Sequence, residues 1–82
     1  MLSKKCKYAL KAMVSLATVY QKGHLTTGAI AENENIPRKF LEQILLELKR
    51  HKLVNSKQGV GGGYYLLKDP SEVSLADLYR IF

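Results

Sequence analysis

The chain has 82 residues, 46% of them hydrophobic and 24% charged, and its formal net charge at pH 7 is +6. This length suffices for one small domain and excludes a multidomain enzyme, and the apolar runs are too short to span a bilayer. The positive charge favours a polyanionic partner such as nucleic acid, although a basic surface also serves solubility.

The first residues imitate a secretion signal, because Lys4, Lys5 and Lys7 precede an apolar stretch. A small-residue cleavage site is missing and helix signals run throughout, so we expect a mature, soluble, cytoplasmic protein. Cys6 is the single cysteine, and no Cys-x-x-Cys or His-x-x-x-His spacing accompanies it. We therefore expect Cys6 to be a small buried side chain, and we predict neither a disulfide nor a metal site.

The first helix is predicted over residues of about 3–21. Ser3 is a suitable N-cap, and Gly23 supplies the expected stop. The apolar residues of one helical face are Cys6, Ala9, Leu10, Met13, Leu16, Ala17 and Tyr20. Their spacing of three and four residues indicates that this face lies in the core.

A helix-turn-helix is predicted over residues of about 27–51. Thr26 or Thr27 caps its short first helix, and Pro37 suits the start of its second helix, which runs to about His51.

The connection between these helices has the residue types that such a unit requires. Ala31 is small where the second helix crosses closely, and Asn35, four residues later, tolerates left-handed backbone angles. Ile36, Leu41 and Ile44 then hold the second helix on the core. An ordinary pair of packed helices is the alternative interpretation.

The second helix of this unit has two different faces. Its apolar face comprises Phe40, Leu41, Ile44, Leu45 and Leu48. Its polar face comprises Arg38, Lys39, Glu42, Gln43, Glu47 and Arg50. Arg, Gln and Glu are side chains that pair with guanine, adenine and cytosine edges, so this face is a candidate DNA-reading surface, with a merely solvated face as the alternative. Leu46 interrupts it, and we favour packing against a neighbouring element or chain over contact with a thymine methyl group.

The stretch "GVGGGYY" at residues 59–65 lies between two apolar runs, which predict a hairpin over residues of about 53–68. Tyr64 stands where a dinucleotide-binding loop or a P-loop needs glycine, so both phosphate motifs are excluded. A flexible linker is disfavoured because the apolar flanks must pair. The loop therefore predicts a wing, whose glycines let the backbone approach another surface next to Lys57 and Gln58.

The last segment predicts a turn at residues 69–71 and a helix from about residue 75. Ser74 and Asp77 form a partial capping box for this helix. The helix reaches Phe82 without a C-terminal signal, so we expect the chain to be cut there rather than finished.

Four segments of the chain, "SKKCKYALKAM", "IAENENIPRKFLEQIL", "LVNSKQGVGGGYYLLKDP" and "VSLADLYRIF", resemble the Rrf2 family of bacterial transcription regulators. The resemblance extends from end to end, and its wing pattern Gly-x-Gly-Gly-Gly-Tyr is highly specific. It implies a mainly α winged helix-turn-helix domain with a small β-hairpin over residues 1–82. It also implies that the full-length protein binds palindromic double-stranded operator DNA as a homodimer, with residues 38–51 in the major groove.

The resemblance further implies which residues contact DNA. Glu42 and Gln43 fall where such proteins contact bases, whereas Lys5 and the wing fall where they contact the DNA backbone. Combined with the charge pattern, the residues assigned to DNA contact are Lys5, Arg38, Lys39, Glu42, Gln43, Lys57, Gln58, Gly61 and Gly62.

Four positions depart from the family pattern. Glycine is usual where this chain has Cys6, Asn35 and Lys52, and arginine is common where it has Gln58. Replacing arginine by glutamine removes a cation suited to a narrow minor groove.

Some members of the family sense iron, nitric oxide or redox state through an iron-sulfur cluster, held by cysteines beyond the winged helix. We expect no cofactor in residues 1–82, and a cluster only where a further C-terminal segment supplies the cysteines. The family's long dimerisation helix also lies beyond Phe82.

Two other function classes are weighed against DNA binding. An enzyme is not predicted, because the sequence offers no set of nucleophile, base and orienting group. A winged helix used for protein contacts in a larger assembly would expose apolar residues such as Leu46 and Val60. The cations that DNA binding requires on the same face are Lys4, Lys5, Arg38, Lys39 and Lys57.

Overall fold

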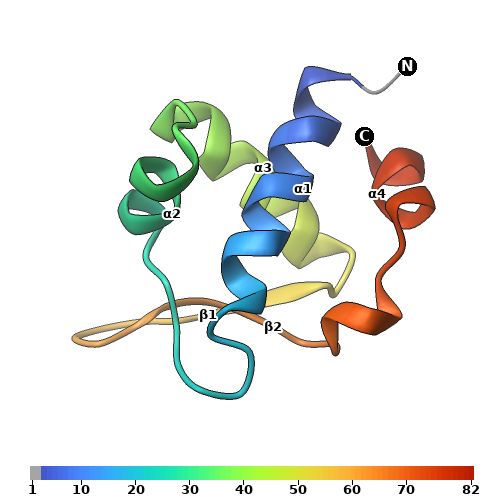
Figure 1. Ribbon diagram of the computed structural model, residues 1–82. Helices are drawn as coiled ribbons and strands as arrows, with labels where there is room; N and C mark the ends of the chain where they lie inside the picture. Colours follow the sequence, from blue (N-terminus) through green and yellow to red (C-terminus); the bar gives the residue numbers. More distant parts are fainter. Residues whose placement is uncertain (1–2) are drawn as a thin grey trace.

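The computed structural model describes residues 3–82 as four α-helices and one antiparallel hairpin. The elements in order are α1 (Lys4–Ala17), α2 (Thr27–Glu34), α3 (Arg38–Arg50), β1 (Val54–Lys57), β2 (Gly63–Leu66), a 3-10 turn (Pro70–Glu72) and α4 (Leu75–Ile81). The hairpin lies beneath the helices, α2 and the wing loop lie on one side of α1, and α4 lies on the other (Figure 1). The predicted winged helix-turn-helix is confirmed.

Helix α1 begins at its expected cap and ends early. The Ser3 hydroxyl oxygen accepts the Cys6 backbone N–H at 3.0 Å, which satisfies one of the free donors of the first turn. At the other end, the Thr18 hydroxyl donates to the Ser15 carbonyl at 2.6 Å. Beyond it the chain passes through tight turns, with Gln21 in a left-handed conformation at φ 61°. The helix therefore stops at Ala17, short of the expected residue 21.

The turn between α2 and α3 depends on one left-handed residue. Asn35 has φ 55° and ψ 49°, as predicted from its tolerance of this conformation. The turn lets the Ile36 N–H donate to the Ala31 carbonyl at 3.0 Å, and it places the Ile36 side chain in the core. Pro37 then leads directly into α3.

One hydrophobic core joins all the elements. Its buried apolar residues are Cys6, Ala9, Ala12, Met13, Leu16, Ile30, Ile36, Leu41, Ile44, Leu45, Leu48, Leu53, Val54, Leu66 and Leu78. Phe40 packs at the margin, edge-on against the Tyr8 ring with centroids 5.3 Å apart. Within residues 3–82, no helix is long and apolar enough to cross a membrane.

The hairpin is tied to the helix-turn-helix by a contact that the sequence analysis missed. Strands β1 and β2 pair antiparallel, from Val54 opposite Leu66 to Lys57 opposite Gly63. On the other edge of β2, the Tyr64 N–H donates to the Leu25 carbonyl at 2.7 Å, and the Leu25 N–H donates to the Tyr64 carbonyl at 2.9 Å. The residue just before α2 thus acts as a one-residue third strand.

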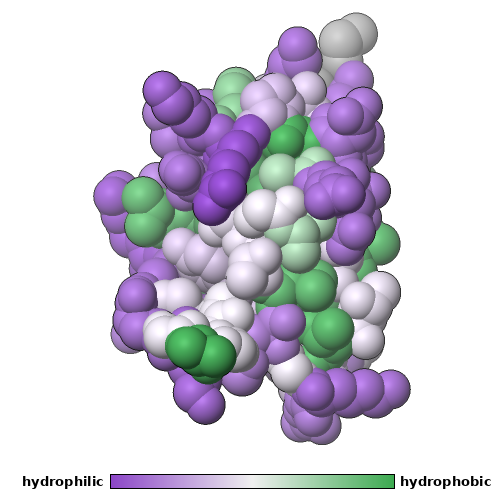
Figure 2. Space-filling view, turned by 90° about the vertical axis from the view of Figure 1, so that its left-hand side faces the viewer, coloured by the Kyte–Doolittle hydropathy of each residue, from purple (hydrophilic) through white to green (hydrophobic). Residues whose placement is uncertain are grey.

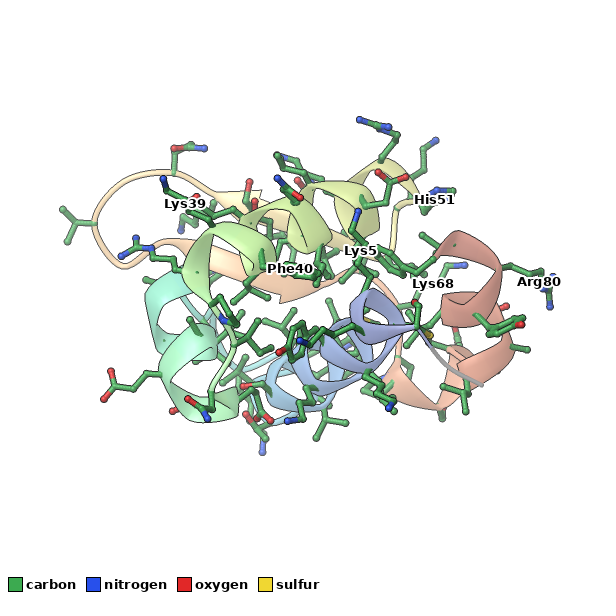
Figure 3. The ribbon with its side chains drawn as sticks, turned by 90° about the horizontal axis from the view of Figure 1, so that it is seen from above. Lys5, Lys39, Phe40, His51, Lys68 and Arg80 are labelled. Atoms are coloured by element: carbon green, nitrogen blue, oxygen red, sulfur yellow. The ribbon has the colours of Figure 1, made fainter. Side chains whose placement is uncertain are left out.

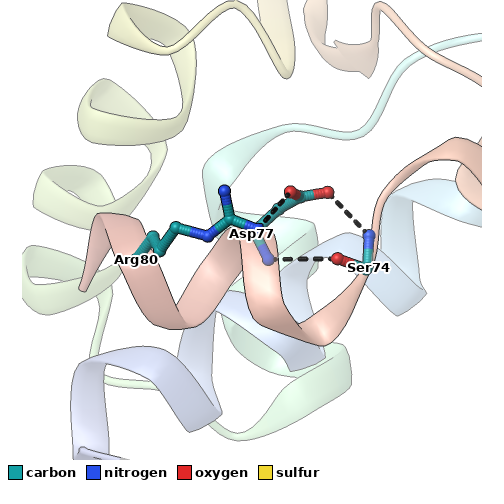
Figure 4. A network of polar contacts seen from close by, with 3 residues as sticks. All are labelled: Ser74, Asp77 and Arg80. Atoms are coloured by element: carbon teal, nitrogen blue, oxygen red, sulfur yellow. Dashed lines mark hydrogen bonds and ion pairs between the residues drawn. The ribbon is translucent and has the colours of Figure 1, made fainter.

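A complete capping box begins α4 (Figure 4). The Ser74 hydroxyl accepts the Asp77 N–H at 3.1 Å, and the Asp77 carboxylate accepts the Ser74 N–H at 2.9 Å. That backbone hydrogen bond, followed by the Ser74 side chain, holds the pKa of Asp77 below its ordinary value of 3.8. Because the folded-state pKa is lowered, the box stabilises the fold at neutral pH, and this stabilisation is lost as the pH falls through the folded-state value.

The C-terminal end of α3 stores backbone strain at Lys52. Its φ of 61° lies in the left-handed region, where the Lys52 N–H reaches the Lys49 carbonyl and the Leu53 N–H reaches the Leu48 carbonyl, each at 3.0 Å. This pair of hydrogen bonds is found at the ends of many helices, usually with glycine at the left-handed position. A lysine there carries the steric cost of its Cβ.

We expect Lys52→Gly to raise the free energy of unfolding by about 0.5–1 kcal/mol, because glycine relieves the strain but gains freedom in the unfolded chain. Lys52→Ala is the matched control, since it removes the same charge and keeps the Cβ. Urea titrations that give equal stabilities for the two variants would contradict the strain at this position.

Candidate nucleic-acid interface

Helix α3 presents a ridge of mostly polar side chains to solvent. Lys39, Gln43, Leu46 and Arg50 follow one another at three- and four-residue spacing, so they lie along one line of the helix, and all are exposed. Glu42 is exposed beside them. The opposite face is held in the core by four fully buried side chains, Leu41, Ile44, Leu45 and Leu48. The predicted base-reading residues Glu42 and Gln43 are therefore free to reach outward.

The starts of α3 and α1 carry cations where helix electrostatics favour anions. Arg38 and Lys39 occupy the first turn of α3, and neither this turn nor the first turn of α1 contains an acidic residue. Since the helix dipole is positive at this end, the charges of Lys4, Lys5, Arg38 and Lys39 add to it and weaken the helix slightly. The same addition makes this surface attractive to phosphate.

Most of these cations are available to a ligand. Among residues 3–82, the side-chain ion pairs join Glu47 to Arg50 at 3.5 Å, Glu47 to His51 at 3.4 Å and Asp77 to Arg80 at 3.8 Å. None of these pairs involves Lys5, Arg38, Lys39 or Lys57. These four side chains are therefore not paired with a carboxylate within residues 3–82.

A groove connects the α3 ridge with the start of α1 and the end of α4. It is lined by Lys5, Gln43, Ile44, Leu46, Glu47, Arg50, Ile81 and Phe82. Figure 3 shows Lys5 reaching from α1 toward α3, on the same side of the molecule as Lys39. Leu46 borders this groove beside Ile81 and Phe82 and remains 56% exposed. Lys5 therefore extends the basic surface from α3 onto α1.

Two of the wing glycines are required by close contacts within the chain itself. A Cβ at position 62 would overlap the Lys57 carbonyl, and a Cβ at position 63 would lie 2.6 Å from the Leu25 carbonyl. Gly62 and Gly63 therefore allow the hairpin to close on itself and against Leu25, which corrects the interpretation that the whole glycine run serves approach to another surface. Gly61 and Val60 remain exposed at the tip. Figure 2 faces this end of the molecule, where hydrophilic side chains surround a central area of near-neutral and hydrophobic residues.

A further cation supports the wing from α3. The Lys49 ammonium donates to the Ser56 hydroxyl oxygen at 2.9 Å, which joins the last turn of α3 to β1. Neither residue stands out in the sequence, because the contact joins a helix to a strand and does not follow from spacing along one element. Lys49 therefore adds another positive charge beside β1.

The domain combines a helix-turn-helix that has an outward ridge with a hairpin bridged to Leu25, just before the first of these helices. Within residues 3–82, Lys5, Arg38, Lys39 and Lys57 form no ion pair. Together these features define a winged helix-turn-helix domain of the DNA-binding class. The chain belongs to the Rrf2 family, since the family profile described as "Iron-dependent Transcriptional regulator" matches residues 2–82. The predicted family is thereby confirmed.

Relatives of known description agree with this membership. An rrf2-like protein of Rhodobacter capsulatus is 43% identical over 98% of this chain and 55% of its own length. The HTH-type transcriptional regulator IscR of Photorhabdus laumondii is 39% identical over 94% of this chain and 47% of its own length. The chain thus spans about half the length of these relatives.

Solved structures of two transcription regulators have the same fold. The T. potens IscR structure superimposes with a TM-score of 0.93 at 32% identity, covering 100% of this chain and 60% of that one. The B. subtilis global cysteine regulator CymR superimposes with a TM-score of 0.92 at 32% identity, covering 99% of this chain and 63% of that one.

The residues described here do not fit an iron ion or an iron-sulfur cluster, although the family description names iron. Over residues 3–82, no group of three His, Cys, Asp or Glu side chains comes together. Cys6 lies on the buried face of α1 and is 1% exposed, so the tightly packed core around it leaves no room for a cluster. No metal chemistry is therefore assigned to these residues.

We expect Gly63→Ala to lower the free energy of unfolding by about 1–3 kcal/mol, because the new methyl group forces the wing away from Leu25. Gly28→Ala is the control. Its methyl group would meet the Arg38 side chain at an ordinary 3.6 Å, within a helix where alanine is favourable, so stability should rise slightly. Urea unfolding measures the stability of both variants. If Gly63→Ala were as stable as Gly28→Ala, the Leu25 contact would not restrain the wing.

Proposed function

We propose that the protein is a sequence-specific transcription regulator that binds operator DNA, with α3 in the major groove and the wing on the backbone and the adjacent minor groove. The observation that carries the proposal is that the outward α3 ridge adjoins Lys5 through one groove and that Arg38 at the start of α3 adjoins the wing through another. Within residues 3–82, Lys5, Arg38, Lys39 and Lys57 form no ion pair. An α-helix with its side chains matches the width of the major groove, so the ridge can reach base edges.

Base reading is assigned to Glu42 and Gln43. The Gln43 amide can donate to and accept from an adenine edge, and the Glu42 carboxylate can accept from a cytosine amino group. Lys39 lies on the same ridge and suits either a guanine edge or a phosphate.

Backbone contact is assigned to Lys5 and to the wing residues Lys57, Gln58 and Gly61, with Gly62 in a supporting role. Gln58 has no charge to attract it into a narrow minor groove, so its contribution there is restricted to hydrogen bonding. Gly62 acts indirectly, because it closes the hairpin that presents Gly61.

The whole protein is proposed to act as a homodimer on a two-fold symmetric site, since symmetric operators require two recognition helices in fixed register. It is proposed to be cytoplasmic and non-enzymatic, in keeping with relatives described as transcriptional regulators. An iron-sulfur cofactor would require cysteines outside residues 1–82, because this chain has one cysteine.

A protein-binding winged helix is the second candidate function. It is favoured by two apolar side chains on the same surface, Leu46 at 56% exposure and Val60 at the wing tip. Leu46 lies beside Ile81 and Phe82 in the first groove, whereas Val60 is at the wing tip and lines no groove with them, so the two do not form one continuous apolar patch.

We expect Gln43→Ala to weaken binding to a selected operator by about 1–3 kcal/mol and binding to random duplex much less, because it removes a base contact. Lys57→Ala should weaken both by similar factors and reduce the logarithmic salt slope by about 1 per bound subunit. Fluorescence anisotropy at two salt concentrations, with operator and scrambled duplex, separates the two effects.

Lys11→Ala is the control for these titrations, since Lys11 is an exposed lysine of α1 that lines neither the α3 groove nor the wing. A binding constant that does not change with salt would reject DNA as the partner. If Gln43→Ala weakened operator and random duplex equally, the assignment of base reading to α3 would be wrong.

A further inference from the structure

A second groove lies between the base of the wing and the start of the helix-turn-helix. Its volume is about 310 Å³, roughly ten times the share of a water molecule in the liquid. Its polar lining includes Thr26, Thr27, Arg38, Ser56, Lys57 and Gln58. These residues come from three different elements, so the groove exists only because the wing is held against α2.

The lining of this groove has the chemistry of an anion site. Arg38 and Lys57 contribute two positive charges, and no acidic side chain lines the groove. The Ser56 oxygen already accepts the Lys49 ammonium at 2.9 Å, so its hydroxyl proton is free to donate elsewhere. The Thr26 oxygen accepts the Ala29 N–H at 3.1 Å and likewise keeps its proton for another partner. Two cations and two hydroxyl donors therefore face one space.

Arg38 points into this groove rather than along the base-reading ridge. A Cβ at Gly28 would lie 3.6 Å from Arg38 Nη1, so the guanidinium lies across the first turn of α2. The ridge runs through Lys39 and Gln43, and Arg38 precedes it by about 100° around the helix axis. Among residues 3–82, Arg38 also forms no ion pair. Its position separates it from the residues that reach base edges.

We propose that this groove binds a single phosphate of the DNA backbone, held jointly by Arg38 from α3 and Lys57 from the wing. The proposal rests on the proposed function, and it changes the expected role of Arg38 from base contact to phosphate contact. The planar guanidinium can donate two parallel hydrogen bonds to one phosphate, and the Lys57 ammonium adds charge from the other side.

This site would couple the wing to the recognition helix through the DNA. One phosphodiester contacted by both elements places α3 and the wing on the same stretch of the DNA backbone. It also places an arginine beside the wing in a chain where position 58 is glutamine. Position 58 of the wing has no arginine, and Arg38 of α3 thus supplies a guanidinium to the DNA backbone beside the wing.

The test is a scan of the selected operator in which one phosphate at a time is replaced by an uncharged methylphosphonate. At one position in each half-site, neutralisation should weaken binding of the unaltered protein about tenfold, because a charged hydrogen bond is lost. At that position Arg38→Ala should lose only about threefold, since the Arg38 contact is already absent and only Lys57 still holds the phosphate. Arg38→Lys should recover part of the sensitivity, because it restores the charge without the fork.

Lys39→Ala is the matched control, as it removes the neighbouring cation from the ridge and should keep the full sensitivity at the same phosphate. Circular dichroism of each variant checks that the helices are retained. Arg38→Ala with undiminished sensitivity at every phosphate, or with an altered base preference, would overturn the proposal while leaving operator binding itself intact. Failure of the unaltered protein to prefer any selected operator would instead reject the proposed function.

A free small anion is the alternative ligand for this groove. A titration with inorganic phosphate distinguishes it from a phosphate of the DNA backbone. We expect the amide NMR signals of Thr27 and Gly62 to move only weakly and without saturation up to tens of millimolar phosphate. Saturation below about 1 mM that disappears in Arg38→Ala would assign the groove to a free anion and overturn the DNA assignment.

Discussion

The close approach of Gly63 to Leu25 is the contact on which the DNA-binding arrangement depends. Two hydrogen bonds between Leu25 and Tyr64 hold β2 beside the residue that leads into α2, and a side chain at position 63 would overlap that backbone. The Asn35 turn fixes α2 relative to α3. The wing, α2 and α3 therefore form one rigid frame, in which the groove at Arg38 and the outward ridge keep a constant separation.

The basic helix ends show how this frame tolerates charges that oppose its own stability. A cation in the first turn of a helix costs roughly 0.3–1 kcal/mol, whereas a fully buried leucine contributes about 1.5–3 kcal/mol. Helix α3 has no side-chain cap at Pro37 but buries Leu41, Leu45 and Leu48 completely. Burial exceeds the electrostatic cost, so the start of α3 is free to carry charges suited to an anionic partner.

The sequence predicted the features that are local in the chain. Ser3, Asn35 and Ser74 act through hydrogen bonds or backbone angles within a few residues, and their roles in the structure match the expectations. The end of α1 was placed too far along because apolar spacing continues to Tyr20 after the helix has given way to turns. The Leu25 bridge connects residues 39 positions apart, and no periodicity along the chain reports it.

The candidate site likewise has features that the local sequence predicts and features that it does not. The outward positions of Glu42 and Gln43 follow from the helical period once the core face is known, whereas the direction of Arg38 does not. Its side chain lies over Gly28 because glycine leaves the first turn of α2 uncovered, a relation between two helices that spacing within α3 cannot reveal. In the proposed complex, base reading and phosphate contact are consequently assigned to different side chains. Substitutions along the ridge are then expected to alter base preference, while the contacts among the wing, α2 and α3 stay unchanged.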